Sequence, residues 1–302
     1  MLSQHNSIAA HQETAEPKRR LGIVPDLSRV FELSGSHMTE ALEFLAERPV
    51  HTVVMTSFIH DNGFDRELNR GTFYGYRSAE GKLEGVALIG HSTLFEARTK
   101  NAIEAFAFVA RKSETPLHLV MSSGSAADTF WDSYMGGTSS PRLRCEEVLF
   151  ETAFPFQVLQ CDWTIENADE SLLVQVAEAQ AEVAFAECGV DPMKRDREGF
   201  LKRVMRRIEN GRVFTVVENG KLVFKADIIA ETTEVIYLEG VYVAREYRGK
   251  GVGSKCLAAL ALQLLNRAEH ICLLSNVDFG KAHKSFVKAG FRATDKCVTL
   301  FV

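Results

Sequence analysis

The sequence lacks the patterns by which several classes of protein are recognised. No Cys-x-x-Cys pair occurs among its six cysteines, and its nine histidines are dispersed, with none at a metal-ligand spacing from a cysteine or carboxylate. No apolar run reaches the roughly 20 residues that are needed to span a bilayer. The net charge of −5 argues against a nucleic-acid carrier that works by neutralising phosphates. We therefore expect no bound metal, no membrane segment and no nucleic-acid partner.

The remaining composition is typical of a globular cytoplasmic protein. With 302 residues the chain is long enough for two domains of ordinary size, and its 46% of hydrophobic residues provide a large core. Cys256 and Cys272 lie in apolar runs, which indicates small core residues in a reducing cytosol. Residues 1–20 are polar and end in three basic residues without a preceding hydrophobic stretch, so we expect a disordered tail rather than a signal peptide.

The most informative segment is "RGKGVGS", between a predicted strand at 234–243 and a predicted apolar helix at 254–267. Its three glycines let the backbone approach a ligand closely and turn its amides toward one point. The helix that follows adds free N–H groups and the positive end of its dipole, and two cations flank the loop. The segment therefore predicts an anion site, most economically for a phosphate. The expected binding residues are Arg248, Gly249, Lys250, Gly251, Val252, Gly253 and Ser254.

The spacing of these glycines separates the loop from two familiar phosphate-binding motifs. No G-x-x-x-x-G-K-[ST] string occurs, and the third glycine is misplaced for G-x-G-x-x-G. The pattern Arg-x-x-Gly-x-Gly within "LEGVYVAREYRGKGVG", followed by "ICLLSNVDFGKAHKSFVKAGF", resembles the core of the GNAT acetyltransferase superfamily over residues 161–302. The resemblance implies that the loop holds the pyrophosphate of coenzyme A and that acetyl-CoA is the co-substrate. It further implies cofactor contacts from Val241, Tyr242, Val243 and Asn276.

The two halves of the sequence repeat one order of elements. Hairpins are predicted at 72–90 and 213–230, and each is followed by strand, apolar helix, strand, helix and strand. We expect an α/β (α+β) fold with a mixed, mostly antiparallel central sheet flanked by helices, built from two tandem GNAT-like units. The expected domains are an N-terminal unit at 21–155 and an acetyltransferase domain at 156–302. The alternative is that an α/β chain gives this order by chance.

The halves differ where the cofactor would bind. The N-terminal half has "FEARTKN", without glycine, at the place of the glycine-rich loop. Backbone without glycine cannot approach a pyrophosphate as closely. We therefore expect that the N-terminal unit has lost its cofactor site and serves as a scaffold, a wall of the substrate pocket or an interaction surface.

Glu239, on the strand before the loop, is the candidate general base. A carboxylate on an apolar face tends to have a raised pKa, which suits deprotonation of an amine. The alternative is a strand-end glutamate that pairs with an arginine or reaches solvent. Phe286 stands where the resemblance implies a tyrosine that protonates the leaving thiolate, so Tyr242 or a water replaces it, the thiolate leaves unassisted, or catalysis is impaired. Counted by two, the residues sharing the face of Glu239 are Val235, Tyr237, Val241 and Val243.

These observations together predict an N-acetyltransferase. It would move an acetyl group from acetyl-CoA to a primary amine of a small molecule or peptide. One alternative is a CoA-binding sensor or interaction protein with weak or no turnover. Another is aminoacyl transfer from tRNA, which the acidic charge and the intact loop oppose. The sequence identifies neither the acceptor nor the acyl length, and it leaves open whether the chain forms a homodimer.

Overall fold

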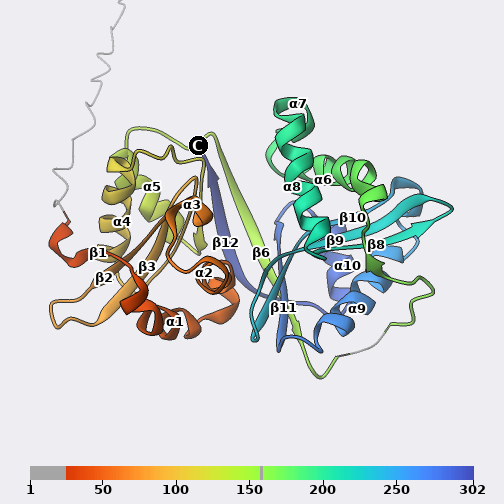
Figure 1. The fold of residues 1–302 in the computed structure, drawn as a ribbon, viewed down its shortest axis with the longest axis horizontal. Coiled ribbons are helices and arrows are strands. Elements are labelled where there is room, and N and C mark those ends of the chain that lie inside the picture. Colours follow the sequence, from red (N-terminus) through yellow and green to blue (C-terminus); the bar gives the residue numbers. More distant parts are fainter. Residues whose placement is uncertain (1–24, 157–158) are drawn as a thin grey trace, which may run out of the picture.

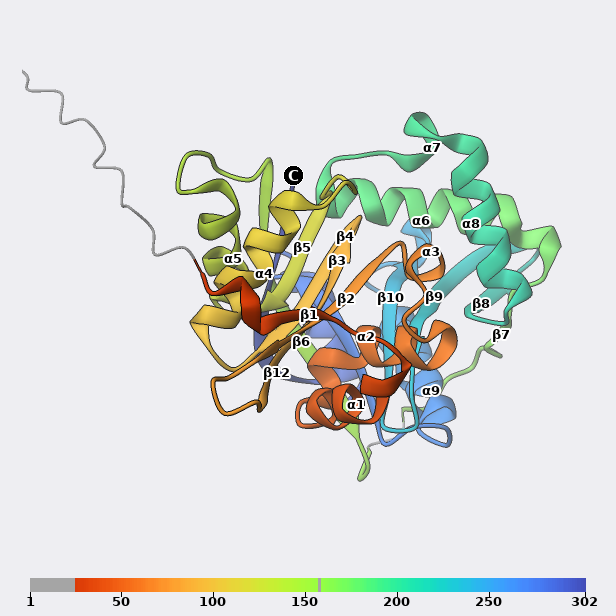
Figure 2. The same cartoon turned by 60° about the vertical axis from the view of Figure 1, so that its left-hand side comes forward.

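One 12-stranded sheet runs through both halves of the protein (Figure 1). The computed structural model describes residues 25–156 and 159–302, so the tail expected at 1–20 lies outside the described residues. The strand order is β1-β2-β3-β4-β5-β12-β6-β11-β10-β9-β8-β7, and the pairs are antiparallel except β4·β5 and β10·β11. Helices flank the sheet, as a view turned by 60° also shows (Figure 2). The predicted fold class is therefore confirmed.

Each half follows the order of elements that the sequence predicted. The elements of the N-terminal half are β1 (Val30–Glu32), α1 (Met38–Ala46), α2 (Pro49–Asn62), α3 (Arg66–Asn69), β2 (Gly71–Arg77), β3 (Leu83–Gly90), β4 (Ser92–Ala97), α4 (Lys100–Lys112), β5 (Leu119–Ser123), α5 (Ala126–Met135) and β6 (Leu143–Ala153). Those of the C-terminal half are β7 (Glu166–Asn167), α6 (Leu173–Cys188), α7 (Pro192–Arg195), α8 (Arg197–Glu209), β8 (Val213–Glu218), β9 (Lys221–Glu231), β10 (Val235–Val243), α9 (Val252–Leu264), β11 (His270–Asn276), α10 (Gly280–Lys288) and β12 (Arg292–Phe301).

The parallel pair in each half opens toward the carboxyl ends of its strands. β4 pairs with β5 only from Ser92 to Leu94, although β4 continues to Ala97. β10 pairs with β11 only from Val235 to Leu238, although β10 continues to Val243. Beyond each paired stretch, the main chain of β4 and of β10 is therefore left without a parallel partner on that side.

The two halves exchange their last strands, which the sequence did not predict. β6, from the N-terminal half, lies between β11 and β12, whereas β12, from the C-terminal half, lies between β5 and β6. In Figure 1 the dark blue β12 accordingly runs beside the strands of the N-terminal half. The division at residues 155/156 remains a prediction, and each half needs the final strand of the other to complete its part of the sheet.

The hydrophobic core of the N-terminal half includes residues of the exchanged strand β12. In the C-terminal half the apolar residues of α9, including Leu257, Leu260 and Leu264, pack against the sheet. In the N-terminal half Val298 and Leu300, which belong to β12, are buried in one cluster with Phe106 and Val120. Among residues 25–156 and 159–302, none of the helices is both long and apolar enough to cross a membrane.

We predict that Leu300→Ala destabilises the N-terminal half although the substitution lies two residues from the C-terminus. Leu300 is 1% exposed, and truncating a buried leucine costs about 2–5 kcal/mol of unfolding free energy. Urea unfolding combined with hydrogen exchange of the β5 amides measures both effects. Val302→Ala is the control, since Val302 is 45% exposed. If the β5 amides of Leu300→Ala exchange their hydrogens at the wild-type rate, the pairing of β12 with β5 is contradicted.

Candidate functional site

The glycine-rich loop joins β10 to α9 in a conformation that requires glycine. Gly249 and Gly251 have φ angles of 76° and 81°, which side-chain-bearing residues rarely adopt. Gly251 directly precedes α9, and no side chain caps that end of the helix. In the described part of the chain, no protein acceptor takes a hydrogen bond from the main-chain N–H groups of residues 249–254. These groups and the positive end of the helix dipole therefore form a site that suits an anion.

The two cations beside the loop differ in how freely they can reach a ligand. The Arg248 Nε donates to the Val243 carbonyl at 2.8 Å, and its Nη2 donates to Glu182 Oε1 at 2.9 Å. Lys250 is exposed, with its Nζ 5.8 Å from the ring centre of Tyr247. The Arg248 guanidinium is therefore held by hydrogen bonds within the protein, and Lys250 is the more accessible of the two charges.

Four other predicted residues contact the protein around the loop. Val252 is buried in the core, and a Cβ on Gly253 would lie 3.0 Å from the Val243 side chain. The Ser254 hydroxyl donates to the Gly251 carbonyl at 3.0 Å and so fixes the loop. Asn276 ends β11, where its Oδ1 accepts from the Asp278 N–H at 2.9 Å. The side chains of Val252, Ser254 and Asn276 hold the loop and the end of β11 in place.

β10 carries a bulge next to the loop. Between the pairs Glu239↔Asp227 and Tyr242↔Lys225, two residues of β10 face one residue of β9. Gly240, in the bulge, has a φ of 60°. This irregularity and a second register shift after Tyr237 interrupt the simple alternation that the sequence predicted for the face of Glu239. The backbone at 241–243 pairs with β9 on one side and lacks a β11 partner on the other.

Glu239 lies half-buried in β10 and accepts a hydrogen bond from the Tyr237 hydroxyl at 2.8 Å. Burial raises the pKa of Tyr237 well above its ordinary value, and the negative charges of Glu239 and Glu147 raise it further. Tyr237 therefore keeps its proton and donates it toward the Glu239 carboxylate. The sequence left open a Glu239 that pairs with an arginine or reaches solvent at the strand end. In the structure its hydrogen-bond partner is Tyr237 instead.

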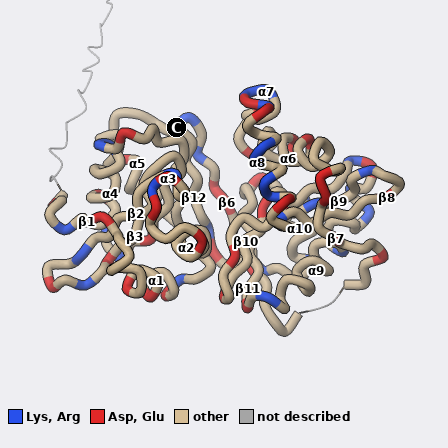
Figure 3. The backbone as a smooth tube through the Cα atoms, viewed as in Figure 1, with Lys and Arg blue, Asp and Glu red and all other residues tan. Residues whose placement is uncertain are grey.

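Two further carboxylates, which the sequence reasoning missed, lie close enough to interact with Glu239. Glu147 comes from β6, where acidic residues are visible in Figure 3, and its Oε2 accepts from the Thr299 hydroxyl at 2.5 Å. Burial raises the pKa of Glu147 despite that hydrogen bond, and the charge of Glu239 adds to the effect. Glu187 lies in the last turn of α6, where the helix dipole disfavours a carboxylate.

Glu187 titrates near neutral pH. Loss of hydration in its crowded surroundings, followed by repulsion from Glu239 and Glu147, raises its pKa to about 7. Glu187 as a whole residue is exposed, whereas its carboxyl group lies among many protein atoms, so part of this shift would be reduced by solvent. The position of Glu187 at the C-terminal end of a predicted helix, where a carboxylate is unfavourable, could have been noticed in the sequence. Nothing in the sequence indicated that β6 pairs with β11, which brings Glu147 to the site.

The position expected for a tyrosine acid is part of the core. Phe286 is 7% exposed, and its ring packs edge-on against Phe150 with 5.4 Å between ring centres. Tyr242, by contrast, is half-buried, and burial raises its pKa, followed by the charge of Glu182. Tyr242 therefore retains a proton that it can donate at neutral pH.

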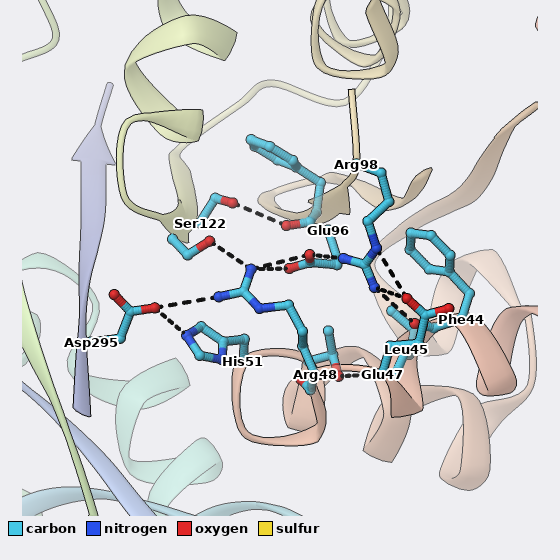
Figure 4. A network of polar contacts seen from close by, with 12 residues as sticks. Phe44, Leu45, Glu47, Arg48, His51, Glu96, Arg98, Ser122 and Asp295 are labelled. Carbon is cyan, nitrogen blue, oxygen red and sulfur yellow. Dashed lines mark hydrogen bonds and ion pairs between the residues drawn. The ribbon is translucent and has the colours of Figure 1, made fainter. Parts of the chain in front are cut away.

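The equivalent opening in the N-terminal half is filled by protein (Figure 4). The Arg48 Nη1 contacts both Glu96 oxygens, at 3.2 and 3.1 Å, and the Ser123 hydroxyl at 3.1 Å. Glu96 is buried and also pairs with Arg98. The Thr99 hydroxyl caps α4, so the N-terminus of this helix differs from the uncapped start of α9. The loss of a cofactor site in the N-terminal unit remains a prediction.

The network also joins the halves. The Asp295 carboxylate of the exchanged strand β12 accepts hydrogen bonds from the Arg48 Nη2 at 3.4 Å and the His51 Nε2 at 2.8 Å.

Within residues 25–156 and 159–302, no group of three histidine, cysteine or acidic residues is arranged to hold a metal ion.

We predict that Glu239→Gln lowers the pKa of Glu187 from its value of about 7, because it removes the carboxylate charge that raises this pKa more than the charge of Glu147 does. A carbon-13 NMR titration of the glutamate carboxyls measures the shift, with Glu187→Gln to assign the signal. Glu178→Gln, on the same helix but outside the group, is the control. An unchanged Glu187 titration would show that these carboxylates do not interact.

Comparison with known proteins is consistent with this geometry. Residues 209–293 match the family model of the acetyltransferase (GNAT) domain. No curated protein sequence matches the chain. Among solved structures, the chain is similar to a GCN5-related N-acetyltransferase from Sphaerobacter thermophilus, at 14% identity and a TM-score of 0.59, over 92% of this chain and 96% of that one.

Two further solved structures extend the likeness. A tandem GNAT protein from the clavulanic acid biosynthesis pathway is 12% identical, with a TM-score of 0.55 over 90% of this chain and 98% of that one. An acetyltransferase of the GNAT family from Colwellia psychrerythraea is 14% identical, with a TM-score of 0.52 over 90% of this chain and 98% of that one. At these identities the likeness concerns the fold. Residues 209–293 are therefore similar to the acetyltransferase (GNAT) domain, and most of the chain shares the fold of these GNAT structures, a tandem GNAT protein among them.

Proposed function

We propose that the protein transfers an acetyl group from acetyl-CoA to a primary amine of a small molecule or peptide. The observation that carries the proposal is the row of main-chain N–H groups at residues 249–254 without a protein acceptor, at the uncapped start of α9. A pyrophosphate supplies acceptor oxygens and negative charge for such a row. Lys250 adds a positive charge from the exposed side of the loop.

The unpaired side of β10 suits the pantetheine arm of the cofactor. The arm contains amides, so it can bond to residues 241–243 as an added strand would, between β10 and the diverging β11. This places the thioester near the bulge, where a main-chain N–H stabilises the oxyanion of the tetrahedral intermediate. Asn276 lies at the end of β11, on the other side of the opening.

The carboxylates of Glu239, Glu147 and Glu187 suit an amine acceptor. An ammonium group is attracted to this anionic cluster, whose carboxylates can accept its proton. We assign the base to Glu239, with Glu147 and Glu187 as neighbouring carboxylates whose pKa values its charge raises. The neutral amine then attacks the thioester carbon, the carbon–sulfur bond breaks, and the nitrogen releases its extra proton to water as the amide forms. The leaving thiolate takes a proton from Tyr242, which regains one from solvent, or directly from water.

One observation favours a second candidate, a CoA-binding sensor without turnover. Phe286 is locked against Phe150 and cannot give a proton to the thiolate. A thiol with a pKa of roughly 8.5 is nevertheless a fair leaving group, so loss of the acid need not abolish transfer. All six cysteines are unpaired, which supports a reducing compartment such as the cytoplasm for either function.

We predict that Gly251→Asp abolishes acetyl-CoA binding while the protein stays folded. The substitution puts a negative charge at the proposed pyrophosphate site and a side chain on a residue with a φ of 81°. Calorimetry with acetyl-CoA measures the affinity, and circular dichroism checks the fold. Gly137→Asp is the matched control, because Gly137 also has a positive φ, 72°, but lies in the N-terminal half. Equal affinities of wild type and Gly251→Asp would refute the site.

We predict that Glu239→Gln lowers kcat for acetylation of a panel of amines by about 10²–10⁴-fold, the usual contribution of a general base, without weakening acetyl-CoA binding. Thiol release measures turnover. Tyr237→Phe, which removes only the hydrogen bond to the carboxylate, is the control and keeps most of the activity. If the wild type binds acetyl-CoA but acetylates none of the amines, the sensor is the better account.

A further inference from the structure

Lys225 is a buried charge that the proposed chemistry does not use. It lies in the middle of β9 with 0% of its side chain exposed. Its Nζ contacts Asp227 Oδ1 at 2.9 Å, Gln180 Oε1 at 2.5 Å and the Gly240 carbonyl at 3.1 Å. Burial lowers the pKa of Lys225, whereas the neighbouring Asp227 carboxylate raises it. A buried ion pair often adds less stability than apolar residues of the same volume, so stability alone is a weak reason for this lysine.

The Gly240 contact links Lys225 to the bulge of β10. Gly240 and Val241 together face the single residue between Lys225 and Asp227, so neither has a Cα partner on β9 in the register. A bulge leaves such a residue outside the ladder of hydrogen bonds. The Lys225 ammonium group donates to the Gly240 carbonyl in this bulge.

The direction of that carbonyl determines the direction of the next N–H. In a trans peptide the C=O of one residue and the N–H of the following residue point in opposite directions. Because the Gly240 carbonyl points to Lys225, the Val241 N–H points away from it. After Leu238, β10 has no partner on the side opposite β9, and this is where the proposed thioester lies.

We propose that Lys225 is a positioning residue of the acyl-transfer site, which holds the Gly240 carbonyl and thereby aims the Val241 N–H at the carbonyl oxygen of bound acetyl-CoA. The proposal rests on the proposed function, since it requires that acetyl-CoA binds between β10 and β11. Lys225 itself touches neither cofactor nor acceptor in this arrangement.

Gly240 is fixed from the same side. Its φ is 60°, and a Cβ there would lie 2.3 Å from Gln180 Oε1 and 2.8 Å from the Lys225 Nζ. Any side chain at this position must therefore displace the lysine contact or rotate the peptide. Gly240→Ala thus disturbs the same geometry without removing the buried charge.

The test follows the acetyl carbonyl itself. Acetyl-CoA labelled with carbon-13 at the carbonyl is added to the full-length protein, and the carbonyl stretching band is recorded by difference infrared spectroscopy. In the wild type the aimed N–H lowers the band frequency relative to free acetyl-CoA. In Lys225→Met the band returns toward the free value, with calorimetric affinity for acetyl-CoA retained. With an accepted amine, kcat falls by about 10²-fold and the KM for acetyl-CoA stays unchanged.

Arg207→Met is the control for a general disturbance of the network. Arg207 contacts Asp227 at 3.4 Å but not Gly240, so the band should stay at its wild-type frequency. A wild-type band in Lys225→Met, or an equal shift in Arg207→Met, overturns the inference while leaving the cofactor site intact. If Lys225→Met does not fold, Gly240→Ala decides in the same way. A wild type that fails to bind acetyl-CoA overturns both this inference and the proposed function.

Discussion

The account of this protein depends on hydrogen-bond donors that the fold leaves unused at the start of α9. A helix begins with N–H groups that need acceptors, and a side chain usually supplies one. α9 instead is preceded by Gly251 as its N-cap, whose left-handed backbone continues the row of free donors back through the loop. The opening between β10 and β11 lies at the same end of the sheet. A diphosphate and its amide-bearing arm match these two features together.

The N-terminal half has the same topology but a different environment at the equivalent place. Its parallel pair opens in the same way, but Arg48 and Glu96 occupy the opening and Thr99 caps the following helix. The donors and the space that a cofactor would need are therefore used by the protein itself. Through Asp295, this opening also connects the N-terminal half to β12, the strand of the C-terminal half that completes the N-terminal part of the sheet.

The sequence predicted the features that depend on local backbone chemistry. The turn at Asn219-Gly220, where both residues have positive φ, identified a hairpin, and the glycines of the loop identified its open conformation. The exchange of β6 and β12 was not predictable, because the apolar pattern of a strand does not state which half it joins. The approach of Glu147 to Glu239 depends on that exchange. Lys225 gave a signal that was overlooked, a lysine within the apolar run of β9.

The most direct test of the central claim observes the loop amides themselves. In a nitrogen-15 NMR titration with coenzyme A, the account predicts large shifts for the amide signals of residues 249–254, together with protection of those amides from hydrogen exchange. The amides of residues 98–101, at the equivalent place in the N-terminal half, should not change. Binding of coenzyme A that leaves the signals of residues 249–254 in place would contradict the claim that these donors hold its pyrophosphate.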